Sequence, residues 1–170
     1  IQKMFSLKRL EAFDDGKRKY MSYKHDPNFV AGLMLYWAEG TKRKNTTVTN
    51  SDARIICFMI NWYKNYFSIP IEAMSVYPHI HSGQNETIIK EYWSNLTGIP
   101  IRNFKKSFTK PEGSGYKKNI LHIGTIALRV GGQGSTYLLF SILGAIAAFL
   151  EISSNIKADI KEWIEEIIYT

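Results

Sequence analysis

The chain has 170 residues, of which 45% are hydrophobic and 22% are charged. These proportions are those of a folded globular protein, so they exclude a disordered chain, and the length suits one domain rather than two. The single cysteine, Cys57, excludes a disulfide framework and a cysteine-based zinc site. Lys and Arg number 22 against 15 Asp and Glu, which gives a net charge of +7 and an isoelectric point near 9.4.

The positive charge is distributed unevenly along the sequence. From residue 151 to the end, two lysines stand against five acidic residues, so the excess of basic residues lies before this point. Lysine and arginine near phosphates release condensed counterions, and clustered basic runs are therefore typical of a surface that binds a polyanion. Charge that serves only solubility is the alternative. The runs are Lys17-Arg18-Lys19, Lys42-Arg43-Lys44, Lys105-Lys106 and Lys117-Lys118.

The first 50 residues predict two helices and a strand. A short helix is expected within residues 1–25, because apolar residues recur there at helical spacing. Asp26-Pro27 is a helix start signal, since Asp caps a helix and Pro suits its first turn. This helix should continue to Glu39, and Gly40 should end it in the left-handed conformation. The segment Thr46–Thr49 reads as a short strand.

Asn50-Ser51-Asp52 predicts the cap of the next helix. Residues 74–81 have the composition of a strand, and a further helix is expected from Asn85 to Leu96. The apolar positions predicted to be buried are Ile55, Met59, Trp62 and Tyr66 in the first of these helices, and Ile88, Ile89, Tyr92, Trp93 and Leu96 in the second.

Two more strands are expected near residues 103–110 and 121–130, followed by a strongly apolar helix with Ser135 as its cap. The apolar run 137–150 has about 14 residues, whereas a membrane span needs roughly 20. We therefore expect a buried core helix in a soluble, cytoplasmic protein with no membrane partner. A last amphipathic helix should follow, with one apolar stripe made by Ile156, Ile160, Trp163 and Ile167.

Interspersed helices and strands of this kind predict an α+β fold. We expect a small curved sheet, mixed or antiparallel, of about four strands packed against helices. Three segments are expected: an N-terminal helical extension (1–25), an α+β domain (26–150) and an acidic C-terminal amphipathic helix (151–170).

The segment 32–40, Gly-Leu-Met-Leu-Tyr-Trp-Ala-Glu-Gly, resembles a nine-residue family motif. The family is the LAGLIDADG homing-endonuclease-like superfamily, and the chain is most similar to its short bacterial single-motif members. Later landmarks also resemble the family: the strand-to-helix junction 49–52, and the last strand and helix, 127–130 and 135–144. The positions in register with the motif are Leu35, Ala38, Glu39 and Gly40.

The resemblance implies a curved sheet that straddles duplex DNA, with the motif helix ending at its centre. In the nuclease members, acidic residues at two such helix ends hold divalent cations. The resemblance therefore places Glu39 as catalytic residue and Mg²⁺ ligand. A helix C-terminus carries about −0.5 charge, and a carboxylate there supplies the hard oxygen ligands that Mg²⁺ prefers.

Several departures from the motif favour a binding protein over a nuclease. A single motif supplies two acidic groups only in a homodimer. Met34 stands where the family has a small glycine, so its side chain should hold two motif helices apart. Trp37 occupies the family's first acidic position. About ten residues link Gly40 to Ser51, which leaves little room for a DNA-reading hairpin.

Three functions remain open. The leading hypothesis is a double-stranded DNA-binding protein, either regulatory or domesticated from a mobile element. The first alternative is a Mg²⁺-dependent, homodimeric, site-specific DNA endonuclease, and the second is a protein-interaction module that uses the C-terminal helix. No small-molecule substrate is expected. The candidate DNA contacts are Lys42, Arg43, Lys44, Lys105, Lys106, Lys110, Lys117 and Lys118.

For three other sets of residues, a structural role is the alternative to a functional one. His79 and His81 would point the same way on a strand, but no third zinc ligand is near them in sequence. Tyr36 and Trp37 would suit base stacking, whereas aromatic side chains on a central helix more often belong to the core. A strand over 103–110 would place Phe104, Lys106, Phe108 and Lys110 on one face.

Overall fold

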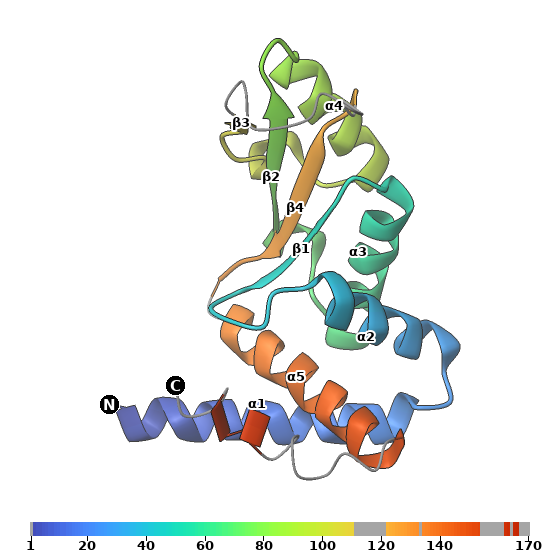
Figure 1. The fold of residues 1–170 in the computed structure, drawn as a ribbon, viewed down its shortest axis with the longest axis vertical. Coiled ribbons are helices and arrows are strands. Elements are labelled where there is room, and N and C mark those ends of the chain that lie inside the picture. Colours follow the sequence, from blue (N-terminus) through green and yellow to red (C-terminus); the bar gives the residue numbers. More distant parts are fainter. Residues whose placement is uncertain (1, 111–121, 133, 154–161, 164, 167–170) are drawn as a thin grey trace. The chain divides into compact units, whose positions relative to one another are not determined.

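The computed structural model describes residues 2–110, 122–132, 134–153, 162–163 and 165–166. The fold is α+β, as expected, with a mixed four-stranded sheet (Figure 1). The strands lie in the order β1-β4-β2-β3, with β2 antiparallel to β4 and parallel to β3. The elements of the described residues are the helices α1 (Gln2–Tyr23), α2 (Pro27–Glu39), α3 (Ala53–Phe67), α4 (Glu86–Thr97) and α5 (Gly134–Ser153), the 3-10 turns η1 (Ile71–Ala73) and η2 (Ile101–Asn103), and the strands β1 (Thr46–Asn50), β2 (Met74–His81), β3 (Phe108–Lys110) and β4 (Thr125–Val130).

The chain divides into two compact units. The first, called here the helical unit, comprises residues 1–46 and 132–170 and contains α1, α2 and α5. The second, called here the sheet unit, comprises residues 47–131 and contains α3, α4 and nearly all of the sheet. The predicted C-terminal helix is described only at residues 162, 163, 165 and 166, which are helical. Its other predicted apolar positions, Ile156, Ile160 and Ile167, lie outside the described residues.

The helical unit is built on close packing of α1 against α5. The contacts advance together along both helices: Arg9 lies over the Phe140 ring and Tyr20 meets Phe149, so the two helices run in the same direction (Figure 1). Gly16 and Gly144 lie where the backbones approach most closely. A Cβ atom at Gly16 would lie 1.7 Å from the Ser141 carbonyl oxygen. Only glycine leaves room for this crossing.

Both of these helices differ from the sequence prediction. The short first helix proves to be 22 residues long. The apolar helix has 20 residues and begins at Gly134, so Ser135 lies inside its first turn instead of capping it. Among the described residues, α5 is the one helix whose length and composition would suit a membrane span. Most of its apolar window (61%) is buried within the protein, which is typical of the core helix of a soluble protein.

Helix α2 begins as predicted but ends differently. The Asp26 side chain accepts hydrogen bonds from the backbone N–H groups of Asn28 and Phe29, and Pro27 occupies the first turn. The prediction of a left-handed Gly40 is wrong, because its φ of −83° and ψ of 154° are extended. Glycine is needed there for space instead. A Cβ atom would lie 2.5 Å from the Tyr36 carbonyl oxygen and 2.8 Å from the Tyr36 ring.

In the sheet unit, the strand predicted over residues 74–81 is confirmed as β2. In β2, every second side chain is buried, from Met74 to Ile80, and the intervening side chains are half-buried. Prediction of the helical faces was less accurate. In α3 the buried stripe is Ile56, Met59, Ile60, Trp62 and Tyr63, whereas the predicted Ile55 and Tyr66 are half-buried.

Helix α4 buries a narrower face than the sequence predicted. Ile89, Trp93 and Thr97 face the core, one helical turn apart. Ile88, Tyr92 and Leu96 were expected to be buried but are exposed by 62%, 40% and 44%. Because the helix carries apolar residues on two adjacent stripes, its sequence alone does not distinguish the core-facing stripe from its neighbour.

The strand predicted over 103–110 is shorter and interrupted. Asn103 ends the turn η2, Phe104 forms an isolated bridge with Val76, and the chain rejoins the sheet only at Phe108. The expectation that Phe104 and Phe108 share one face is therefore wrong. Phe104 is buried, while Phe108 is 58% exposed.

Candidate nucleic-acid interface

A tight loop at the end of α2 carries three consecutive basic residues. We call residues 41–45 the basic loop. The Tyr36 hydroxyl donates to the Thr41 carbonyl oxygen at 2.6 Å, and the Thr41 hydroxyl donates to the Asn45 carbonyl oxygen. The Asn45 N–H donates to the Arg43 carbonyl oxygen at 2.9 Å. Lys44 adopts a left-handed conformation with φ of 66°. The loop is thus fixed by hydrogen bonds to both of its ends.

The three basic side chains have different surroundings. Lys42 donates to the Gly40 carbonyl oxygen at 2.6 Å, where it neutralises the negative end of α2. Burial lowers the pKa of Lys42, and the neighbouring Glu39 carboxylate opposes this shift. Arg43 forms an ion pair with Glu166 at 3.1 Å. Lys44 is exposed at the tip of the loop.

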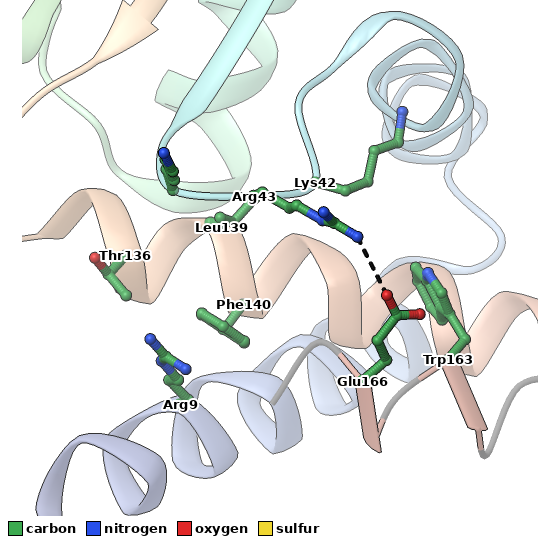
Figure 2. A pocket seen from close by; sticks show the side chains of 9 residues that line it. Arg9, Lys42, Arg43, Thr136, Leu139, Phe140, Trp163 and Glu166 are labelled. Carbon is green, nitrogen blue, oxygen red and sulfur yellow. Dashed lines mark hydrogen bonds and ion pairs between the residues drawn. The ribbon is translucent and has the colours of Figure 1, made fainter. Parts of the chain in front are cut away.

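The basic loop lines one side of a pocket of about 580 Å³ in the helical unit (Figure 2). Arg9 enters from α1, with its guanidinium carbon 5.3 Å from the centre of the Phe140 ring. Four basic side chains and one carboxylate therefore surround a cavity that also has an apolar wall. The lining residues are Arg9, Lys42, Arg43, Lys44, Thr136, Leu139, Phe140, Trp163 and Glu166.

Glu39, the predicted metal ligand, is exposed as the last residue of α2. Its carboxylate interacts electrostatically with Lys42, a cation that would compete with a metal ion. The described residues contain no group of three or more His, Cys, Asp or Glu side chains that could hold a metal ion. Within the described residues of one copy, Glu39 therefore has no second carboxylate grouped with it as a Mg²⁺ ligand.

No protein-family model, curated protein or solved structure matches this chain. What the protein does therefore has to be inferred from its own side chains.

The sheet unit has a second polar surface, which we call the open sheet face. It consists of the half-buried side chains of β2 and their neighbours on β4. The guanidinium carbon of Arg129 lies 4.5 Å from the centre of the Tyr77 ring, and its Nε donates to the Thr47 hydroxyl at 3.3 Å. The centres of the His79 and Phe108 rings are 5.8 Å apart. Arginine stacked on an aromatic ring suits contact with phosphates or bases.

The sequence prediction missed this surface, although two signals were present. The alternation in residues 74–81 separates Ser75, Tyr77, His79 and His81 from the core-facing positions. Arg129 interrupts an otherwise apolar strand. A charged side chain in such a strand indicates that its face does not contact the core.

The remaining candidate contacts are scattered. Lys105 and Lys106 are exposed on the link between the Phe104 bridge and β3, and the Lys105 N–H donates to the Val76 carbonyl oxygen. Lys110 ends β3, but its side chain lies outside the described part, as do Lys117 and Lys118. The basic loop and Lys105-Lys106 belong to different units.

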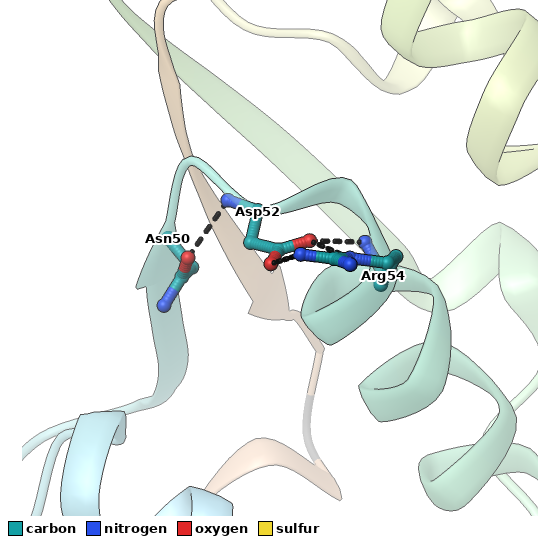
Figure 3. A network of polar contacts seen from close by, with 3 residues as sticks. All are labelled: Asn50, Asp52 and Arg54. Carbon is teal, nitrogen blue, oxygen red and sulfur yellow. Dashed lines mark hydrogen bonds and ion pairs between the residues drawn. The ribbon is translucent and has the colours of Figure 1, made fainter.

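The strand-to-helix junction that resembled the family is a capped helix start (Figure 3). The Asn50 side chain accepts from the Asp52 N–H, and Asp52 accepts from the Arg54 N–H and from the Arg54 guanidinium, with distances between 2.7 and 3.0 Å. The hydrogen bonds from the Arg54 side chain lower the pKa of Asp52 to about 2. This network orients the start of α3, as the predicted cap required.

Tyr36 and Trp37, the adjacent aromatic residues of α2, have different environments. Tyr36 is fully buried, and this burial raises the pKa of its hydroxyl well above the ordinary value. Trp37 is 38% exposed, and the centre of its ring lies 6.4 Å from the centre of the Phe149 ring. Tyr36 therefore belongs to the core, and it positions the basic loop through its hydroxyl.

Proposed function

We propose that this protein binds double-stranded DNA, with the basic loop and Arg9 contacting backbone phosphates. We further propose that its fold is LAGLIDADG-like and that its role is regulatory or domesticated from a mobile element. The observation that carries the proposal is the fixed conformation of the basic loop at the rim of a pocket that Arg9 also lines. A loop already ordered before binding loses little conformational entropy when it meets a phosphate.

The open sheet face supports the same proposal independently. Tyr77 and Arg129 offer an aromatic ring and a guanidinium on one surface of the sheet. A guanidinium on a sheet surface can contact the phosphates of a duplex, whereas an aromatic ring stacks only on bases that are unpaired. The two surfaces belong to different units, and variants of Arg9 and the basic loop test the surface of the helical unit alone.

Binding is tested by fluorescence anisotropy with a labelled random-sequence duplex over a series of salt concentrations. Lys44→Gln and Arg9→Gln should each weaken binding and reduce the slope of log K against log salt by about 1. Lys8→Gln is the matched control, because Lys8 is exposed on α1 and does not line the pocket. Absence of affinity at low salt, or equal effects of Lys44→Gln and Lys8→Gln, would refute the proposal.

A homodimeric, Mg²⁺-dependent endonuclease is a second candidate. It is favoured by the surface of α2, where Ala31 and Ala38 are exposed on either side of the half-buried Leu35. Two copies that pack along this surface would bring their Glu39 side chains together, with the half-buried Met34 and Leu35 side chains setting the distance between the helices. This candidate requires dimers by analytical ultracentrifugation and Mg²⁺-dependent cuts that Glu39→Gln abolishes while binding is retained. A protein that remains monomeric on DNA excludes it.

A further inference from the structure

An acidic segment lies at the pocket that the basic loop and Arg9 line, which we call the basic pocket. We call the described residues 162, 163, 165 and 166 the acidic segment. The Glu166 carboxylate lies 3.1 Å from an Arg43 guanidinium nitrogen, and Trp163 lines the same pocket as Glu166 (Figure 2). Glu162 and Glu165 are exposed in the same segment. A negatively charged part of the chain thus lies against the side chains proposed to bind phosphate.

A carboxylate on Arg43 uses the same donors that a phosphate would use. Arginine binds both groups through N–H donors in the same planar geometry. While Glu166 holds Arg43, the positive potential of the pocket is partly neutralised and one phosphate contact is occupied. The acidic segment therefore competes with any anion that enters the pocket.

The contact is weak enough to be displaced. The Arg43 and Glu166 side chains are 84% and 60% exposed. Ion pairs this exposed contribute little to stability and are screened by salt. Trp163 is half-buried and adds an uncharged, apolar side chain to the lining of the pocket. Such a segment lowers affinity for an anion without closing the pocket.

We propose that the acidic segment is an internal competitor that lowers the affinity of the basic pocket for DNA phosphates. This inference rests on the proposed DNA-binding function. The segment would also increase discrimination between ligands. Only a ligand that makes several phosphate contacts gains enough binding free energy to displace both Glu166 and Trp163.

The test compares affinities for the same labelled duplex at low salt, using the full chain. Glu166→Gln should raise affinity about two- to fivefold, the range expected for loss of one exposed ion pair. Glu11→Gln is the matched control, since Glu11 is exposed on α1 and makes the same charge change outside the pocket. In an Arg43→Gln background, Glu166→Gln should have a much smaller effect.

Trp163→Ala separates competition from simple charge removal. It leaves the net charge unchanged, so a rise in affinity supports release of the segment from the pocket. A fall in affinity would mean that Trp163 itself contacts DNA, which overturns the inference. If the wild-type protein binds DNA but Glu166→Gln and Glu11→Gln raise the affinity equally, the inference about the acidic segment fails while the proposed function stands. If no variant binds at low salt, the proposed function fails as well.

Discussion

Replacement of Gly16 or Gly144 by alanine should destabilise the helical unit, although alanine favours helix formation. At Gly16 the new Cβ would lie 1.7 Å from the Ser141 carbonyl oxygen, and at Gly144 it would lie 1.9 Å from the Phe13 carbonyl oxygen. Both obstructing atoms are backbone, so the helices must separate by well over an ångström. Overpacking costs about 1–3 kcal/mol or more, and the helix propensity of alanine returns about 1 kcal/mol.

Because backbone atoms obstruct both methyl groups, we take an overpacking cost of about 3 kcal/mol, so the expected net loss is about 2 kcal/mol for each variant, which lowers the melting temperature by roughly 4–8 °C in a protein of this size. The double variant should lose less than the sum, because one separation of the helices accommodates both methyl groups. Gly134→Ala is the control, since nothing lies within 4 Å of its Cβ position. Thermal unfolding followed by circular dichroism compares these four variants with the wild type. If Gly16→Ala is as stable as Gly134→Ala, the close crossing of α1 and α5 is wrong.

Three further predictions concern the cap, the acid range and the loop. Asp26→Ala should cost about 1 kcal/mol in urea unfolding, because two N–H groups of α2 lose their acceptor, whereas Asp26→Asn should retain most of the stability. Hydrogen bonding from Lys90 lowers the pKa of Glu86 from 4.5 to about 2, so the stability it contributes is complete above about pH 4.5 and is lost as the pH falls towards 2. Glu86→Gln should flatten the pH dependence of the urea midpoint between pH 5 and 2; an unchanged profile contradicts the role of Glu86. Tyr36→Phe should cost about 1 kcal/mol, because the Thr41 carbonyl loses its donor, and it should weaken DNA binding by loosening the basic loop. Unaltered affinity would show that the loop does not depend on this bond.

The exposed and buried faces of α4, and the stretch around Phe104, show which features could not be predicted from the sequence. In α4, Ile88 and Ile89 are adjacent and equally apolar, yet only Ile89 is buried. In the stretch around Phe104, strand propensity was strong, but the turn η2 and the isolated bridge removed the chain from the sheet. Each outcome depends on which partner lies opposite, and local propensity carries no information about that partner.

The candidate site divides in the same way. The basic loop was predicted from sequence, because its three basic residues are consecutive and follow the motif, whereas the predicted metal ligand Glu39 does not line the pocket. Arg9 and Glu166 were missed, since neither is near the loop in sequence and a single charged residue on a helix carries no distinctive signal. Their role appears only when side chains of α1, the basic loop, α5 and residues 163 and 166 surround one pocket.

By itself, the sequence determined the elements whose signals act over a few residues: the start of α2 at Asp26-Pro27, the alternation of β2, the cap at Asp52 and hence the α+β class. Hydrogen bonds between near neighbours and the period of side-chain direction decide these features. The tertiary structure alone decided the crossing at Gly16 and Gly144 and the contact between Arg43 and Glu166. These pairs are separated by more than a hundred residues, so their meeting depends on the path of the whole chain.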